Sequence, residues 1–176
     1  MTLEQLKYPL GKFQPPDVFT KDILNTYIDS IAKFPSKIIY ETNNLTEDQL
    51  NTPYRPQGWT IRQVVHHCAD SHINSLVRFK WALTEETPTI KPYEEALWAE
   101  LADCKMPLAA SYKILEGVHQ RWVVLLNSLD GHALAKGFIH PNHGRELKLP
   151  EVIGIYAWHC NHHLAHITTL KNRKGW

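Results

Sequence analysis

Apolar residues recur at intervals of three or four positions in four long stretches of the chain, and this spacing is typical of amphipathic helices. The four stretches cover about residues 19–42, 61–83, 108–129 and 150–171. In the first of them the apolar side chains belong to Ile23, Leu24, Tyr27, Ile28, Ile31, Phe34, Ile38 and Ile39. Four long helices joined by loops predict an all-α fold of the four-helix-bundle type.

Local signals mark the ends of three of these helices. Thr60 followed by Gln63 has the pattern of a capping box, and Trp59 stands in position for a hydrophobic staple. Gly131 occupies the expected position after the end of the third helix. Pro150 suits the first turn of the fourth helix, because its missing N–H would have no partner there.

The segments between the helices carry signals of their own. Residues 1–18 hold Pro9, Gly11, Pro15 and Pro16 and predict an extended arm. Pro35 lies inside the first helix and predicts a kink or a break just before it. Short helical turns are expected at 46–50 and 93–103, and residues 138–147 predict a small hairpin before the last helix. These connections are long enough for a topology other than simple up-and-down, within one domain that covers residues 1–176.

Composition and charge exclude several classes of protein. The chain has 19 basic and 18 acidic residues, a net charge of +1, which argues against a nucleic-acid-binding face. Three cysteines without a CxxC pair argue against a disulfide scaffold. No apolar run reaches the roughly 18 residues of a membrane span, and the N-terminus lacks the pattern of a signal peptide. We therefore expect a soluble cytoplasmic protein that acts on a small molecule. Neither a Gly-rich phosphate loop nor a GxSxG elbow is present.

Histidine is the unusual residue, with eleven copies. On the last helix, His159, His163 and His166 interrupt the apolar stripe that faces the core. Residues four positions apart lie about 5–6 Å from each other, so His159 and His163 could converge on one metal ion. A single core histidine is more often a hydrogen-bonded core residue than a ligand. Three on one stripe each need partners for both ring nitrogens, which a shared metal would provide.

The second long helix offers a third histidine for the same ion. His67 shares one side of that helix with Gln63, Asp70, Ser71, Asn74 and Arg78. This polar side is either a solvated face or the lining of a wet cleft with His67 at its floor, and periodicity leaves both interpretations open. His72 and His132 are expected to be dispensable for metal binding.

Two further residues are candidates for catalysis. Asp70 lies one turn from both His66 and His67, so it could orient a metal ligand or form an ordinary i,i+4 pair with His66. His140 precedes the last helix and could act as an acid or base at the mouth of the site, or lie in a surface loop. His119, His132 and His143 are expected at the surface or in loops. Trp81, Trp98, Trp122 and Trp158 are expected in the core or an interface.

Two motifs link the chain to a known family. The stretch Gly58-Trp-Thr-Ile-Arg-Gln-Val-Val-His-His67 resembles the second-helix signature of the DinB/YfiT-like superfamily. The stretch Tyr156-Ala-Trp-His159-x-x-x-His163-x-x-His166 resembles its C-terminal helix motif. Shorter matches to the YfiT-like branch extend the likeness over essentially the whole chain, at Tyr8-Pro9, Thr52-Pro-Tyr-Arg55, Arg78-Phe-Lys80, Leu83-Thr-Glu-Glu86 and Gly137-Phe-Ile-His-Pro141.

The resemblance implies a four-helix bundle that holds a divalent metal on His67, His159 and His163. It implies zinc as the metal, with nickel as an easy substitute, and a homodimer. In the family pattern His166 stands beside the site rather than on the metal, and Cys160 is not a ligand.

The resemblance also suggests what the site does, because YfiT-like proteins are described as metal-dependent hydrolases. Three neutral imidazoles leave a coordination position open for water and substrate, which suits that chemistry. The same position could hold a thiolate, as in thiol-dependent transferases of other branches. A non-catalytic metal-binding protein is the third alternative, and no carboxylate stands out as a general base.

Overall fold

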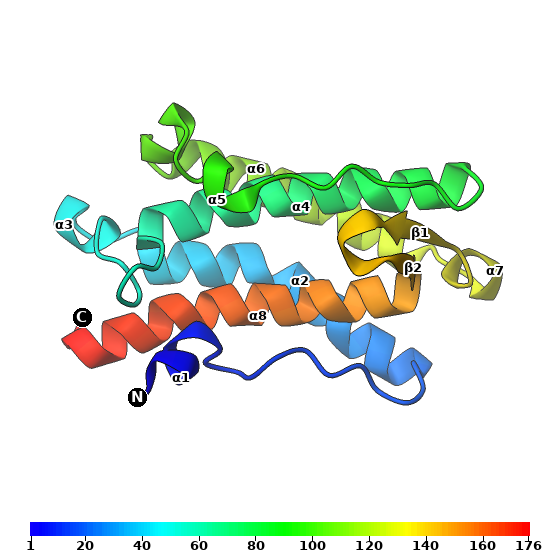
Figure 1. Ribbon diagram of the computed structural model, residues 1–176, viewed down its shortest axis with the longest axis horizontal. Coiled ribbons are helices and arrows are strands. Elements are labelled where there is room, and N and C mark those ends of the chain that lie inside the picture. The colour runs from blue at the N-terminus through cyan, green and yellow to red at the C-terminus, as the bar shows by residue number, and fades with distance from the viewer.

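Four long helices form the body of the protein in a computed structural model that describes all residues 1–176. They are α2 (Lys21–Thr42), α4 (Ile61–Thr84), α6 (Ala109–Asn127) and α8 (Leu149–Lys174), and they lie along the long axis of the molecule (Figure 1). The only sheet has two strands. The prediction of an all-α, four-helix-bundle fold is therefore confirmed. None of the helices has the length and apolar character that crossing a membrane requires.

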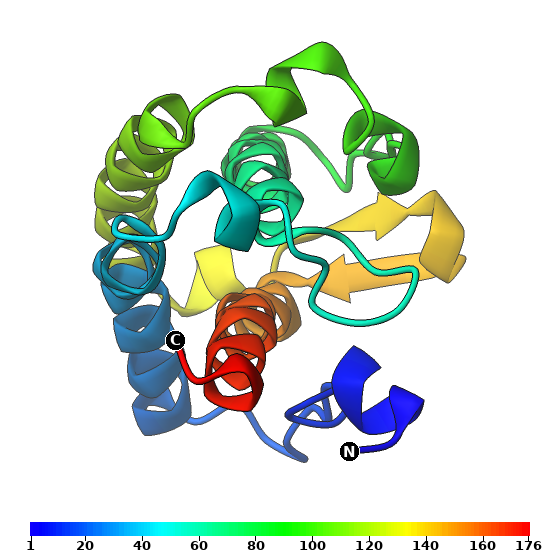
Figure 2. The ribbon, with the colours of Figure 1, turned by 90° about the vertical axis from the view of Figure 1, so that its left-hand side faces the viewer.

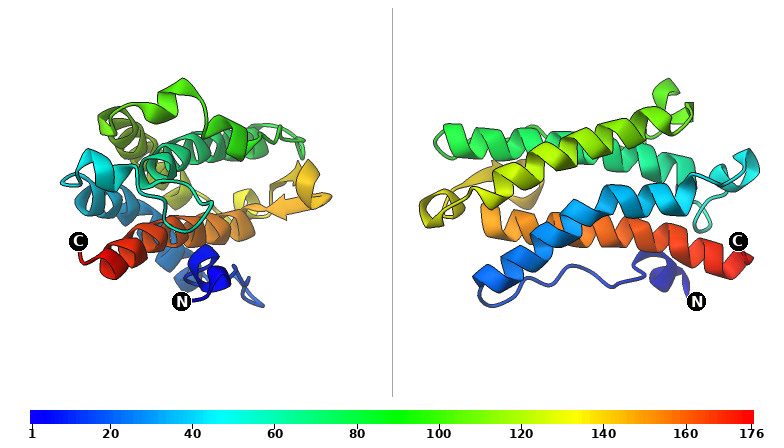
Figure 3. Two further views of the ribbon diagram at one scale, coloured as in Figure 1. Left: turned by 60° about the vertical axis from the view of Figure 1, so that its left-hand side comes forward. Right: turned by 180° about the vertical axis from the view of Figure 1, so that it is seen from behind.

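The order of the helices differs from a simple up-and-down bundle. Helices α4 and α6 run in the same direction, because the connection over residues 85–108 returns along the molecule before α6 begins (Figures 1 and 3). Helix α2 packs against both α8 and α6, and α6 packs against α4. Helices α4 and α8 complete the ring, seen end-on in Figure 2, with the loosest packing of the four pairs. The backbones of α4 and α8 are therefore farther apart than those of the other pairs, and side chains fill the space between them, which is called the α4–α8 seam below.

The core lies inside this ring and consists of apolar side chains from all four helices. Its largest fully buried members are Trp122, Phe34, Phe79 and Phe138, followed by Ile31, Ile38, Ile61, Ile90, Leu115, Leu149, Ile153 and Ile167. Full burial of one such aliphatic or aromatic side chain stabilises the folded state by about 1.5–3 kcal/mol.

The predicted signals at the helix ends are mostly confirmed. The Thr60 hydroxyl accepts from the Gln63 N–H, and the Gln63 side chain accepts from the Thr60 N–H, so the capping box at the start of α4 is complete. Pro150 lies in the first turn of α8, which begins one residue earlier, at Leu149. Helix α8 ends at Lys174, and the next residue, Gly175, has a φ of 72°, the left-handed conformation that glycine adopts without strain.

The prediction for Gly131 was wrong. Helix α6 ends at Asn127, and Gly131 instead begins the short helix α7 (Gly131–Leu134), in which the Ala133 N–H donates to the Asp130 carboxylate. An acidic residue followed by a glycine suits the start of one helix as well as the end of another, and the packing of the chain decides between them.

Four other segments follow the sequence pattern wholly or in part. Pro35 does not break α2, which continues through it as a single helix. Figure 3 shows that this helix is bent along its length. The arm over residues 1–18 is not wholly extended, because Thr2 caps a short helix, α1 (Leu3–Lys7). The turn expected at 46–50 is α3 (Glu47–Leu50). The helix expected at 93–103 is divided into α5 (Glu95–Trp98) and a 3-10 turn at Ala102–Lys105.

The predicted hairpin before the last helix is present. Strands β1 (Gly137–His140) and β2 (Arg145–Lys148) pair antiparallel, with Gly137 opposite Lys148. A 3-10 turn at Pro141–His143 and a left-handed Gly144, with φ of 64°, connect them. The long connection after α4 joins this hairpin, because Ile139 exchanges backbone hydrogen bonds with Pro88 and Ile90. The hairpin therefore anchors the returning segment beside the α4–α8 seam.

Candidate metal centre

His67 of α4 and His159 and His163 of α8 converge in the seam between these two helices. The Nε2 atoms of His67 and His159 lie 3.2 Å apart. One ring nitrogen from each of the three residues lies within 4.8 Å of the other two. His159 and His163 share a face because they are one turn apart on α8, and the packing of α4 brings His67 opposite them.

This spacing fits a metal ion. Two imidazole nitrogens that each stand about 2.0–2.1 Å from a tetrahedral ion are roughly 3.4 Å from each other. The observed 3.2 Å between the Nε2 atoms of His67 and His159 is close to that value. Two side chains from different helices are thus already arranged as neighbouring ligands would be, without a change of backbone.

The surroundings keep these rings in the form that binds metals. Burial lowers the pKa of His67 to about 4, and the charge of His166 adds to the effect. Burial is also the largest reason that the pKa values of His159 and His163 lie well below the usual range, and neighbouring histidines lower them further. All three imidazoles are therefore neutral near pH 7, and a neutral imidazole has a free lone pair for a metal ion.

Aromatic rings cover the three histidines. The Trp59 ring packs against His67, with ring centroids 4.6 Å apart, and against His163, at 6.4 Å. Tyr156 lies against His159 at 5.5 Å. The sequence pattern identified Trp59 only as a helix staple, so its contact with the site was missed. Its place just before the capping box of α4 was a usable signal, because α4 carries His67 within its second turn.

A second group of histidines lies beside the first. His162, His163 and His166 also bring ring nitrogens within 4.8 Å of one another. The Nε2 of His166, however, donates to the backbone oxygen of Lys7 over 3.0 Å, and its ring stacks on Tyr54 with centroids 3.9 Å apart. The N-terminal arm thus already holds His166. This supports the interpretation that His166 stands next to the site rather than in it.

Neither of the two candidate catalytic residues, Asp70 and His140, forms a hydrogen bond with the three histidines. Both ring nitrogens of His66 have other partners, Ser111 Oγ at 2.7 Å and the Met106 carbonyl at 3.0 Å, so the expected pair with Asp70 is not formed. Burial raises the pKa of Asp70 to about 6. The ring of His140 lies against His143, with centroids 4.7 Å apart, and burial lowers its pKa to about 4.

The expectation that His119 lies at the surface was wrong. Only 2% of His119 is exposed, and its Nε2 lies 2.8 Å from Nδ1 of His72, which is fully buried. The Nε2 of His72 in turn lies 3.1 Å from Nδ1 of His159. His132 and His143 are exposed, as expected. The sequence pattern thus did not identify His72 and His119, which are linked to His159 by hydrogen bonds.

The fold and the histidine cluster define a class: a four-helix-bundle protein whose helices α4 and α8 present a set of side chains able to hold a metal ion. The family model described as the DinB superfamily matches residues 35–167 of the chain. The chain belongs to the DinB superfamily, and the resemblance inferred from its motifs is confirmed.

Close relatives are known from several Bacillus species. A protein of Bacillus cereus (strain AH820) and one of Bacillus anthracis (strain A0248) are each 50% identical over 174 residues, which is 99% of this chain and all of the relative. Both are named "putative metal-dependent hydrolase". The solved structure of YfiT from Bacillus subtilis is 44% identical in sequence and superposes on this protein with a TM-score of 0.95. The match covers 98% of this chain and 99% of the YfiT chain. It is described as a "probable metal-dependent hydrolase with an unusual four-helix bundle topology".

Removal of the metal is expected to leave the bundle folded. The 30 buried apolar residues of the core form one cluster that includes none of the three histidines, so the helices do not depend on the site. A ligand that binds only the folded state at a thousandfold excess over its Kd contributes about 4 kcal/mol, so chelation should lower the melting temperature. Far-UV circular dichroism before and after chelation measures both effects. Loss of most of the helical signal would contradict the prediction.

Proposed function

We propose that the protein is a metal-dependent hydrolase of small molecules whose divalent ion, zinc, is bound by His67, His159 and His163. The 3.2 Å between the Nε2 atoms of His67 and His159 is the observation that supports the proposal most directly. Relatives that match over their full length and are named for metal-dependent hydrolysis support it independently.

Three imidazole ligands leave one position of a tetrahedral ion open, which distinguishes catalytic zinc sites from closed structural ones. When bound, the ion supplies a Lewis acid that polarises a substrate carbonyl and lowers the pKa of a water molecule. The chain's own residues hold the three rings neutral by burial. Trp59 covers His67 and His163 and so limits the access of bulk water to their outer faces.

The test uses protein loaded with cobalt, whose spectrum reports its ligands. Ester, amide and lactone substrates are screened with the wild-type protein and with two variants, His159→Ala and His132→Ala. Hydrolysis should be lost in His159→Ala and retained in His132→Ala, because His132 is exposed on α7, away from the site. Hydrolysis that survives in His159→Ala would contradict the proposal.

The same protein is titrated with a panel of small thiols. A bound thiolate adds an intense charge-transfer band to the cobalt spectrum, whereas oxygen ligands do not. Tight thiol binding, together with thiol-dependent consumption of an electrophile, would overturn hydrolysis in favour of a metal-dependent thiol transferase. Stable metal binding without turnover in either screen would favour a non-catalytic metal-binding protein.

A further inference from the structure

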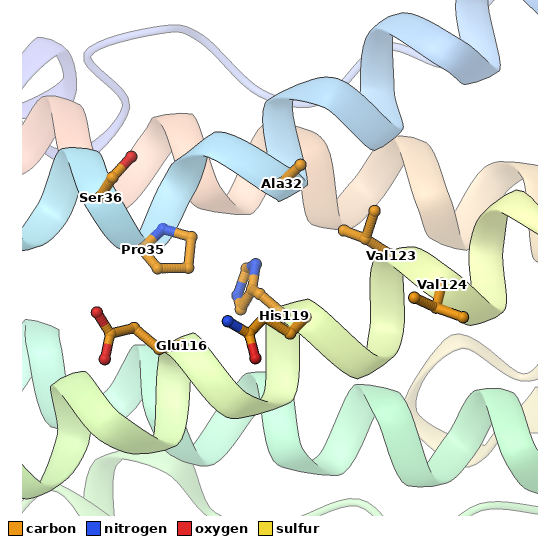
Figure 4. A pocket seen from close by; sticks show the side chains of 8 residues that line it. Ala32, Pro35, Ser36, Glu116, His119, Val123 and Val124 are labelled. Atoms are coloured by element: carbon orange, nitrogen blue, oxygen red, sulfur yellow. The ribbon is translucent and has the colours of Figure 1, made fainter.

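Pro35 deprives one backbone oxygen of α2 of its usual partner. In an α-helix the N–H of each residue donates to the carbonyl four positions earlier, and proline has no N–H. The carbonyl of Ile31 is therefore left without a helical donor, and Ile31 is 0% exposed, so water does not replace it. His119 of α6 lies with its Nδ1 2.7 Å from this oxygen. Figure 4 shows Pro35 and His119 beside the same pocket between α2 and α6.

This contact determines where His119 carries its proton. A carbonyl oxygen can only accept, so Nδ1 of His119 must donate. Burial lowers the pKa of His119 to about 4, which keeps the ring neutral with a single proton. Its Nε2 is then an acceptor, and it lies 2.8 Å from Nδ1 of His72. Nδ1 of His72 must therefore donate in its turn.

The same reasoning passes through His72 to the candidate metal centre. His72 is 0% exposed and no carboxylate lies among its hydrogen-bond partners, so a charge on this ring would be buried without a counter-ion. The ring is therefore neutral, with its one proton on Nδ1. Its Nε2 accepts from Nδ1 of His159 over 3.1 Å. His159 is left with a lone pair on Nε2, the atom that lies 3.2 Å from Nε2 of His67.

We propose that His119 and His72 are positioning residues, which hold His159 in the tautomer whose Nε2 lone pair faces the metal position. The inference rests on the proposed function, because a metal ion is what this lone pair would bind. The chain of hydrogen bonds takes one member from each long helix: the Ile31 carbonyl from α2, His119 from α6, His72 from α4 and His159 from α8.

Such a chain does more than fill the core with satisfied polar groups. A metal-binding histidine usually donates its second ring N–H to a carboxylate, a carbonyl or water, and loss of that partner weakens metal binding roughly 10- to 100-fold. Here the partner of His159 is the imidazole of His72, which by itself could adopt either tautomer. The Ile31 carbonyl fixes the tautomer of His119, and through it that of His72, because a carbonyl oxygen can accept a hydrogen bond but cannot donate one.

The tautomers are measured first, in the metal-free wild-type protein, by long-range ¹⁵N–¹H correlation of the imidazole rings. His72, His119 and His159 are expected to be protonated on Nδ1. His66 and His166 serve as internal controls and should be protonated on Nε2, since this atom faces the carbonyl of Met106 in one ring and of Lys7 in the other. A proton on Nε2 of His72, His119 or His159 would overturn the proposal.

The second measurement is the affinity for cobalt in competition with a chelator. His119→Phe keeps the ring volume but removes both nitrogens, and it should weaken cobalt binding roughly 10- to 100-fold. His119→Gln retains a donor and an acceptor in one side chain and should bind within about threefold of wild type. The exposed His132→Phe is the matched control and should bind as the wild type does.

The two variants separate positioning from simple packing. Equal losses in His119→Phe and His119→Gln would mean that a donor and an acceptor at this position do not rescue cobalt binding, which would overturn the proposal. A folded His119→Phe that binds cobalt like wild type would mean that only the ring shape matters, and would overturn it as well. If His119→Phe does not fold, the tautomers of the wild-type protein and the cobalt affinity of His119→Gln still test the proposal. If wild-type protein binds no cobalt, the proposed function fails, while the tautomers still test the hydrogen-bond chain alone.

Discussion

Replacing His67, His159 or His163 with alanine is expected to reduce bound metal from a full equivalent to a small fraction. Each residue would contribute one of only three protein ligands. Loss of a side chain that merely supports a ligand weakens binding roughly 10- to 100-fold, so loss of a ligand itself should have a larger effect. The remaining two imidazoles would leave the ion mostly to water, which any chelator displaces.

Elemental analysis of the purified variants measures this effect directly, on protein that has never been exposed to a nickel column. His132→Ala is the control, because His132 is exposed on α7. His72→Ala, which the sequence pattern placed with the dispensable histidines, is not a neutral control, since His72 lies 3.1 Å from Nδ1 of His159. A full equivalent of metal in all three ligand variants would refute the site.

Truncation of Trp122 should give the largest loss of stability from a single core substitution. Trp122 has no exposed surface, and its ring lies between Phe79, at 5.6 Å, and Tyr156, at 5.2 Å between centroids. Removing a large aromatic side chain from such a position leaves a cavity and costs about 3–5 kcal/mol. The free energy of unfolding, measured with urea on metal-free Trp122→Ala, should fall by that amount.

Trp81→Ala is the matched control for this measurement. Trp81 belongs to the same residue type on α4, but 39% of it is exposed, so its loss should change the free energy of unfolding by about 1 kcal/mol or less. The four tryptophans that the sequence grouped together thus differ in their roles. Equal losses in the two variants would mean that Trp122 is not packed as the structure describes.

The long helices were predictable because their signals are local. A helix with a stripe of apolar residues is stable when that stripe packs against other helices, and the identity of those helices does not matter for this prediction. The Thr60–Gln63 capping box is equally local, since both hydrogen bonds form within one turn. The end of α6 and the role of Gly131 were not predicted correctly, because α6 ends at Asn127 and a separate short helix, α7, begins at Gly131.

The candidate metal centre was predictable only in part. The spacing of His159 and His163 on one helix is a local property, and the resemblance to the DinB superfamily added His67. His72 and His119 could have been noticed, because each lies on an apolar stripe: His72 with Ala69 and Leu76, and His119 with Leu115 and Trp122. A buried imidazole at such a position needs partners for both nitrogens. Those partners come from other helices, and periodicity does not identify them.

The sequence by itself determined the fold class, the four helices and the position of His159 and His163 on one face, since these depend on spacing along single helices. Only the tertiary structure decided that α4 lies beside α8 and that the chain from Ile31 through His119 and His72 ends at His159. The physical reason is the reach of the interactions. Helix formation and capping depend on neighbours within a few residues, whereas a hydrogen bond across 47 or 87 positions exists only after the helices have packed.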